Sequence, residues 1–300
     1  MRNNPYAQFR ETNRKQLKVN FHTHAGVCMP NKCGELPMDE VIRAYHKAKY
    51  DALAISNHNE YIPPPLNNEL LVIDAVEYTA HPHMNLVGTS HFHDVPHQQA
   101  IDRALEEGAF VILNHPNWIN QGYWPIALMQ ELKGYIGIEI LNPVINRLQG
   151  SGLAVDTWDA LLSSGRPVWG FGNDDFHQWH DLERAYNIIS AQSNDFSSIK
   201  AAVQDGCFYV SNGLALRSLT LNKNSLEVEA GFFVESYINQ FEYTLIGCHG
   251  RMLDRSVGKK VILSFCEDEP YIRVEARAKN GSLLFLQPMI LDSSSYNSDN

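Results

Sequence analysis

The stretch LKVNFHTH, residues 17–24, joins a short alternating run to a pair of histidines. LKVN has the alternation of a β-strand, and His22 and His24 follow it two positions apart. Side chains at i and i+2 of an extended chain point to the same side, so both imidazoles should face one point at a strand end. Paired imidazoles indicate a metal site if other parts of the chain supply further ligands.

Composition indicates a globular protein without a nucleic-acid-binding surface. Of the 300 residues, 44% are hydrophobic and 19% are charged, and 24 Lys and Arg against 34 Asp and Glu give a net charge of −10. Nonspecific nucleic-acid binding depends on clustered Lys and Arg, and the sequence has no basic tract. A nucleotide held in a metal-lined pocket remains compatible with this charge.

The sequence also bears on location. The N-terminal residues lack the apolar core of a signal peptide, and no apolar run approaches the roughly 20 residues needed to span a bilayer. The five cysteines are odd in number and mostly far apart, which fits a reduced compartment better than a disulfide framework. We therefore expect a cytoplasmic protein with no membrane partner, and the sequence leaves its oligomeric state open.

Two parts of the chain differ in pattern. From residue 17 to about 211, short apolar runs alternate with helix-like segments such as PMDEVIRAYHKAKYD (37–51). This alternation implies a parallel sheet, and seven or eight such units predict a closed TIM-like barrel. After Gly213, about six short and often alternating runs predict a small antiparallel β domain. The predicted fold is α/β, with a barrel over residues 1–211 and a β-rich domain over residues 212–300.

Polar residues collect at or next to the predicted strand ends, namely His22, His24, His58, Glu77, His83, His115, Asp175 and His177. The carboxyl ends of barrel strands meet on one face, so these side chains should converge. Crowded, buried imidazoles and carboxylates are costly unless cations compensate them. Each motif alone has an ordinary structural explanation, but their common position favours bound metal ions.

The ligand types narrow the choice of metal. Imidazole with carboxylate and little thiolate suits Zn, Mn or Fe. Eight or nine ligands exceed the four to about six that one such ion takes, so two or three divalent ions are expected. Glu77 is the one glutamate among the strand-end ligands and is therefore the predicted bridge between them.

In order along the chain, these motifs resemble the PHP (polymerase and histidinol phosphatase) superfamily. The resemblance covers residues 17 to about 211 and rests on HTH (22–24), NHN (57–59), Glu77, NHP (114–116) and DDFH (174–177). HMNLVG (83–88), GCFYVSNGLAL (206–216) and LQPMIL (286–291) look like the branch that includes carbaryl-hydrolase-like metallohydrolases. The resemblance implies a distorted seven-stranded (β/α) barrel, up to three metal ions and, usually, hydrolysis of phosphate esters.

The resemblance also implies ligand sets. A first metal would be held by His22, His24, Glu77 and Asp175, and a second by Glu77, His83 and His115. A third would take His58 and His177 with one ligand from the loop after His24. In that loop Cys33 precedes Gly34 where the family usually has Asp or His, and Cys28 is nearby. Either a thiolate such as Cys33 completes the third site, or that site is weak or empty.

Other positions have less definite roles. Asn57 stands where the family usually has Asp, and it can orient His58 without serving as a charged ligand. Asp174 is expected to orient ligands. His81, His91 and His93 remain alternatives to His83.

The resemblance implies a metal-bridging hydroxide that attacks phosphorus, with Glu77 and Asp175 in the catalytic centre. Arg184 is the candidate phosphate clamp, with a surface salt bridge as the alternative. His180 is the candidate proton donor to the leaving oxygen. Asn117, Trp118 and Trp179 are candidates to line a pocket for an aryl group or nucleobase, although core packing explains the tryptophans equally well.

The expected substrate is a small-molecule phosphomonoester or diester, which includes nucleotides. The same centre would also serve a carboxylic or carbamate ester hydrolase. Two other classes remain open from the sequence: an iron-dependent redox enzyme and a non-catalytic, metal-stabilised binding protein.

Overall fold

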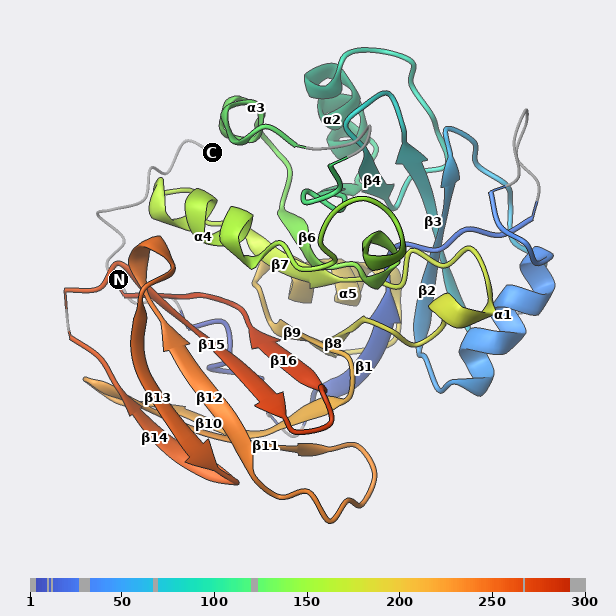
Figure 1. Cartoon of the computed structure of the whole chain (residues 1–300). Coiled ribbons are helices and arrows are strands. Elements are labelled where there is room, and N and C mark those ends of the chain that lie inside the picture. The colour runs from blue at the N-terminus through green and yellow to red at the C-terminus, as the bar shows by residue number, and fades with distance from the viewer. Residues whose placement is uncertain are drawn as a thin grey trace.

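A long mixed sheet runs through both parts of the chain (Figure 1). The structure is a computed structural model, and it describes residues 4–9, 11, 13–26, 33–66, 70–119, 124–266 and 268–291. The first part contains strands β1 (Lys15–Asn20), β2 (Ala52–His58), β3 (Leu71–Tyr78), β4 (Met84–Val87), β5 (Phe110–Leu113), β6 (Gly137–Leu141), β7 (Trp169–Gly172), β8 (Tyr186–Ala191) and β9 (Phe208–Ser211). Its helices are α1 (Met38–Lys47), α2 (His97–Glu106), α3 (Ile126–Glu131), α4 (Val155–Ser163) and α5 (Phe196–Gln204), with the 3-10 turns η1 (Pro143–Arg147) and η2 (Trp179–Asp181).

The second part is built of strands, as predicted. They are β10 (Leu214–Leu221), β11 (Ser225–Phe232), β12 (Phe241–Ile246), β13 (Met252–Gly258), β14 (Lys260–Ser264), β15 (Tyr271–Ala278), β16 (Leu283–Leu286) and β17 (Met289–Ile290), with the 3-10 turn η3 (Cys248–Gly250). Strands β9 and β13 and helix α3 were not predicted from the sequence.

Local signals explain where the predicted helices begin and end. Helix α1 follows Pro37 and buries one face of Val41, Ile42, Ala44 and Tyr45. Helices α2 and α4 are followed by Gly108 (φ +87°) and Gly165 (φ +84°), which adopt the left-handed conformation that glycine accepts without cost. At the start of α5 the Asp195 side chain accepts a hydrogen bond from the Ser198 N–H at 2.8 Å.

The sheet is parallel in two blocks and antiparallel between them. Strands β1, β2 and β3 are parallel, as are β5, β6 and β7, whereas β4 is antiparallel to β3 and β5, and β8 is antiparallel to β1. The expectation of a parallel sheet throughout is therefore wrong. Residues 79–83, between β3 and β4, are too few for a parallel crossover, which takes a dozen residues or more.

The segment after β1 is hydrogen-bonded to the segment after β7. Thr23 forms a parallel bridge with Phe176, and the His24 N–H donates to the Phe176 carbonyl at 2.9 Å. The Phe21 N–H donates to the Asn173 side chain, also at 2.9 Å. The segment after the first strand thus runs beside the segment after the seventh. The closed seven-stranded barrel itself stays a prediction.

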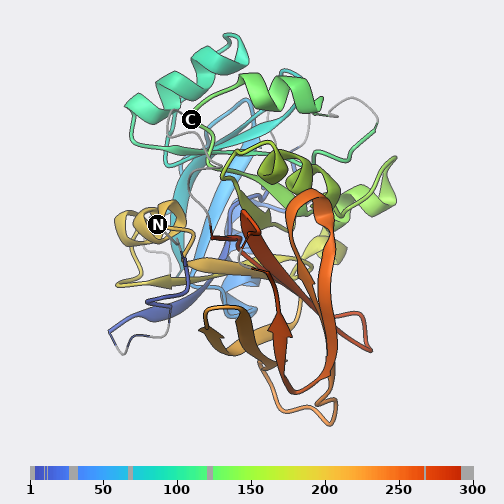
Figure 2. The same cartoon turned by 90° about the vertical axis from the view of Figure 1, so that its left-hand side faces the viewer.

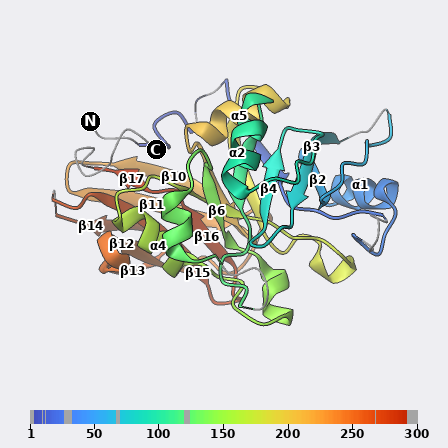
Figure 3. The same ribbon diagram turned by 90° about the horizontal axis from the view of Figure 1, so that it is seen from above.

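The C-terminal strands continue the same sheet. Strand β16 pairs with β9, so β15, β12 and β13 extend the sheet of the first part, while β10, β11 and β14 form a separate three-stranded sheet. Figure 1 shows these strands at the lower left, away from α1, and Figure 3 shows the same separation from above. In Figure 2 the orange and red strands face the viewer at the lower right. Because hydrogen bonding is continuous from β9 to β16, the sheet marks no boundary, and the division at residue 211 stays a prediction.

The buried apolar residues form two clusters. One cluster includes Val41 and Tyr45 of α1 with Phe21 and Phe171. Another includes Ile101 of α2, with Trp158 and Leu161 of α4 among its members. Across the described residues, no helix is both long enough and apolar enough to cross a membrane.

Candidate metal centre

The predicted ligands lie together at one rim of the sheet. His22 and His24 follow β1, His58 ends β2, and Glu77 sits opposite His58 in the register of β3. Because β4 runs antiparallel, its start lies at the rim where β3 ends, which brings His83 to the same place. His115 follows β5, and Asp175 and His177 follow β7.

Glu77 is at the centre of the cluster and is 1% exposed. Its Oε1 lies near ring nitrogens of His22 (3.3 Å), His83 (3.2 Å) and His115 (3.4 Å). Its Oε2 lies near those of His24 (3.5 Å) and His58 (3.1 Å). The two carboxylate oxygens therefore face different sets of imidazoles, which is the arrangement that a bridging ligand needs.

Asp175 contacts the cluster from the side of β7. Its Oδ1 is 3.1 Å from His22 Nε2, 3.2 Å from His24 Nε2 and 3.5 Å from His177 Nδ1. Asp175 (φ +49°) and His115 (φ +31°) both have the positive φ that is costly for residues other than glycine. Such backbone conformations are typical of positions where surrounding structure fixes a functional side chain.

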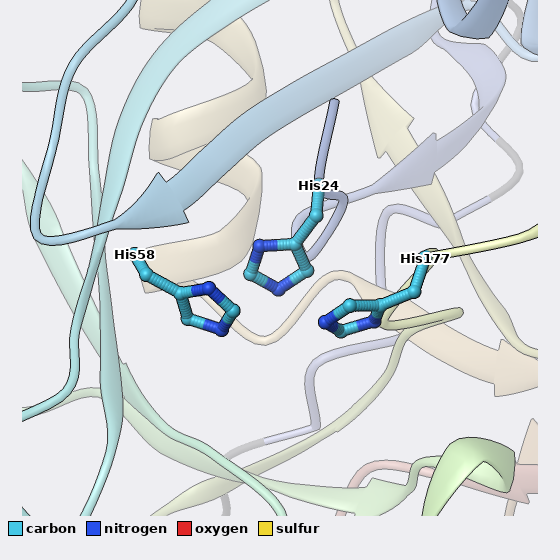
Figure 4. Close-up of side chains that lie close together, drawn as sticks. All are labelled: His24, His58 and His177. Carbon is cyan, nitrogen blue, oxygen red and sulfur yellow. The ribbon is translucent and has the colours of Figure 1, made fainter. Parts of the chain in front are cut away.

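A third group of histidines opens towards the surface. Figure 4 shows His24 between His58 and His177, with ring centroids 4.3 Å and 4.2 Å from it. The ligand atoms of these three residues lie within 4.8 Å of one another. The same holds for three further groups: His22, His24 and Glu77; His22, His115 and Asp175; and Glu77, His83 and His115.

The donor set fits divalent metal ions. Within the described part of the chain, four buried atoms of the cluster have no hydrogen-bond partner, namely Glu77 Oε2, His24 Nδ1, His83 Nε2 and His115 Nδ1. Unpaired buried polar atoms are costly, and several at one place are rare in a native structure. Carboxylate oxygens and imidazole nitrogens are ligands for Zn, Mn and Fe, so bound metal accounts for both the crowding and the missing partners.

The pKa shifts of most of the cluster suit metal binding. Burial would raise the pKa values of Glu77 and Asp175, but neighbouring histidines hold both well below the usual range. Burial lowers the pKa of His24 and of His83, which leaves these rings neutral with a free lone pair. For His22 burial also lowers the pKa, yet surrounding carboxylates raise it well above its usual value.

Glu139 of β6 is a residue of the site that the sequence reasoning missed. Its Oε1 is 2.8 Å from His22 Nδ1 and accepts from Asn173 at 2.9 Å. Its Oε2 accepts from the His115 N–H and from Asn142, both at 2.9 Å. Glu139 thus fixes the ring of one ligand and the backbone of another. The signal was a glutamate inside the apolar run YIGIEILN.

A cavity of about 350 Å³ opens beside the cluster. Its described lining includes His58, Glu77, His83, His115, Asp175 and His177. Glu35, Trp118, Val144, Ile145, Arg147, Leu148 and Gln178 complete it. The predicted ligands thus share a cavity with an apolar group of side chains and with Arg147, which the sequence reasoning did not single out.

Comparison with solved structures identifies the fold. A two-domain protein containing a predicted PHP-like metal-dependent phosphoesterase, from Bacteroides vulgatus, matches 90% of this chain and 92% of its own, with a TM-score of 0.53 and 17% identity. The chain has a PHP-like fold. The lesion-specific endonuclease PfuEndoQ from Pyrococcus furiosus aligns more loosely, with a TM-score of 0.46 and 12% identity over 63% of this chain and 56% of its own. No family model and no curated protein matches the sequence.

On the PHP-like fold, two predicted residues lie outside the cavity. Arg184 and His180 are exposed and are absent from the described cavity lining. The backbone N–H of Arg184 donates to Asp174, which also accepts from Tyr45 and Tyr50. Burial raises the pKa of Asp174 to about 6 against these hydrogen bonds. Asp174 therefore anchors the turn after Asp175, and this anchoring leaves Arg184 in solvent.

Of the predicted pocket residues and the alternatives to His83, some lie at the cavity or beside His83 and others do not. Trp118 lines the cavity, whereas Trp179 is 52% exposed and Asn117 bonds to Asp156 and Thr157. Of the alternatives to His83, His91 and His93 pair with Glu107, and His81 stacks on His83 with centroids 5.2 Å apart.

Cys33 is the predicted thiolate ligand of the third group. Cys33 is disulfide-bonded, and its sulfur accepts from the His58 N–H at 3.3 Å. A disulfide sulfur lacks the thiolate charge that makes cysteine a zinc ligand, so Cys33 does not complete the third group in this form of the chain. Cys28 lies outside the described residues, and Cys207, Cys248 and Cys266 are free.

Proposed function

We propose that the protein is a metal-dependent hydrolase of small-molecule phosphate esters. The observation that carries the proposal is the position of Glu77, whose two oxygens face separate sets of buried imidazoles. One carboxylate shared in this way is suited to two metal ions, and paired ions are typical of enzymes that displace groups at phosphorus. The PHP-like fold is consistent with this activity.

The positions of the predicted ligands in the cluster divide them among the metal sites. His22, His24, Glu77 and Asp175 would hold one ion, and Glu77, His83 and His115 a second. His58 and His177 would hold a third together with one further ligand, because a neutral imidazole offers one lone pair and His24 already uses it for the first ion. Bound Zn, Mn or Fe ions supply a nucleophile at neutral pH, by lowering the pKa of water, and positive charge for the phosphate oxygens.

The chain itself contributes orientation and shape. Glu139 holds His22 Nδ1, so His22 Nε2 faces Glu77 and Asp175. Trp118 stands edge-on to His83 and His115, with centroids 5.5 Å and 5.1 Å away, and restricts the space beside these ligands. The cavity is large enough for a phosphate group and one small leaving group.

Metal content and turnover, measured together, test the proposal. Purified protein is assayed with p-nitrophenyl phosphate and bis-p-nitrophenyl phosphate, beside the variants His22→Ala and Asp175→Ala. We expect bound Zn, Mn or Fe and loss of turnover in both variants. His46→Ala, on the exposed face of α1, is the matched control and should leave turnover unchanged. Turnover by metal-free protein would overturn the proposal. If the metal-loaded protein cleaves only aryl carboxylic or carbamate esters, hydrolysis of those esters replaces hydrolysis of phosphate esters as its function.

A further inference from the structure

Arg147 lies at the end of η1, in the wall of the cavity that contains the predicted ligands. Among the described residues that line this cavity, Arg147 is the only lysine or arginine. Its side chain is 41% exposed and lines the cavity, so part of it is accessible to a ligand.

Asp181 holds Arg147 in place. The Arg147 Nη2 donates to Asp181 Oδ2 at 2.7 Å, and Nε donates to Oδ1 at 3.3 Å. Asp181 Oδ2 also accepts from the backbone N–H groups of His177 (3.0 Å) and Gln178 (3.1 Å). Arg147 is thereby fixed to the same turn that carries the His177 ligand.

The guanidinium retains donors for a substrate. It has five N–H donors, and two of them go to Asp181. Within the described ranges of the chain, no other acceptor contacts Arg147. The planar edge that remains is suited to two oxygens of a phosphate group.

The wall beside Arg147 is apolar. Val144 and Ile145 are buried, Leu148 is 45% exposed, and Trp118 reaches the rings of His83 and His115. An exposed leucine and a tryptophan that line the same cavity favour a ligand with a flat, apolar group.

The charges near the cavity disfavour a second anionic group. Asp181 already balances the charge of Arg147, and Glu35 adds a carboxylate to the lining. A second phosphate on the substrate would meet no further Lys or Arg among the described lining residues, and the Glu35 carboxylate would add to the negative charge around it.

From these contacts we infer, on the basis of the proposed function, that Arg147 binds the phosphate oxygens and that Trp118 and Leu148 receive the leaving group. The substrate class is phosphate esters of uncharged aromatic or apolar alcohols. In the reaction an oxygen of water forms the new bond to phosphorus, the bond to the ester oxygen breaks, and the alcohol leaves with a proton from that water.

The test compares benzyl phosphate with glycerol 1-phosphate on metal-loaded protein. Both release a primary alcohol, so intrinsic reactivity differs little and the ratio of kcat/KM reports the apolar wall. We expect benzyl phosphate to be preferred by about tenfold or more. Leu148→Ser should reduce that preference, whereas Leu105→Ser, at a similarly exposed leucine (40%) on α2, should not.

Inorganic phosphate, as a competitive inhibitor, tests Arg147 separately. Arg147→Gln should weaken phosphate inhibition by about tenfold to a hundredfold, the range for a lost charged hydrogen bond. Arg43→Gln is the matched control, because Arg43 also pairs with an aspartate, Asp39, at 2.8 Å outside this cavity. Equal turnover of the two esters, or unchanged phosphate inhibition in Arg147→Gln, would overturn the inference while the proposed function stands. Failure to cleave any phosphate ester would overturn both.

Discussion

Replacing Glu139 with glutamine tests how the centre is held in position. The substitution keeps the shape of the side chain but turns one oxygen into an NH₂ donor. Each oxygen of Glu139 accepts two hydrogen bonds: Oε1 from His22 and Asn173, and Oε2 from the His115 N–H and Asn142. In either orientation, the NH₂ group of the glutamine therefore faces two groups that are themselves hydrogen-bond donors.

The magnitude follows from that geometry. Two buried hydrogen bonds left unmade, at about 1–3 kcal/mol each, lower the free energy of unfolding by about 2–6 kcal/mol. Loss of the partner that orients His22 should also weaken metal binding by about 10- to 100-fold. The carboxylate is 1% exposed, so water cannot replace these bonds without a rearrangement.

Urea unfolding of the metal-free protein measures the first effect, and chelator competition with zinc measures the second. Glu106→Gln, at an exposed glutamate of α2, is the matched control and should change neither quantity. If Glu139→Gln binds zinc with unchanged affinity and unfolds at the same urea concentration, then Glu139 does not orient His22 and the reasoning is refuted.

Three other outcomes are expected. His177→Ala removes a member of the outer histidine group and should lower metal content by about one equivalent while the inner groups stay loaded; unchanged metal content by mass spectrometry would contradict this. Arg273→Met leaves Asp159 buried without its partner, which it now contacts at 2.6 Å, and should cost about 3–5 kcal/mol in urea unfolding without changing metal content; an unchanged midpoint would show that this pair contributes little. Chelation should lower the melting temperature, because an ion at about 100 times its dissociation constant stabilises the fold by about 2.7 kcal/mol; identical melting curves with and without chelator would count against metal bound to the folded state.

The sequence predicted contacts correctly where they depend only on a residue's position at the end of a strand. His22, His58, Glu77, His115 and Asp175 each follow or end an apolar run, so strand ends that meet at one rim bring them together. Helices α1, α2, α4 and α5 were predictable because their buried faces and terminal glycines are local features.

Features that depend on distant contacts could not be read in the same way. Arg147 belongs to the cavity because Asp181, 34 residues away, holds it there. Arg184 is close to the ligands in sequence, but Asp174 binds its backbone and its side chain is exposed. The antiparallel direction of β4 was not predicted, because a short apolar run does not indicate the direction of its strand in the sheet.

Anomalous diffraction from crystals of the zinc-loaded protein, recorded on both sides of the zinc edge, tests the central claim most directly. The proposed arrangement predicts peaks on both sides of the Glu77 carboxylate, within bonding distance of the His22 and His83 rings. Zinc found only at the surface histidines His91 and His93, with no peak beside Glu77, would contradict it.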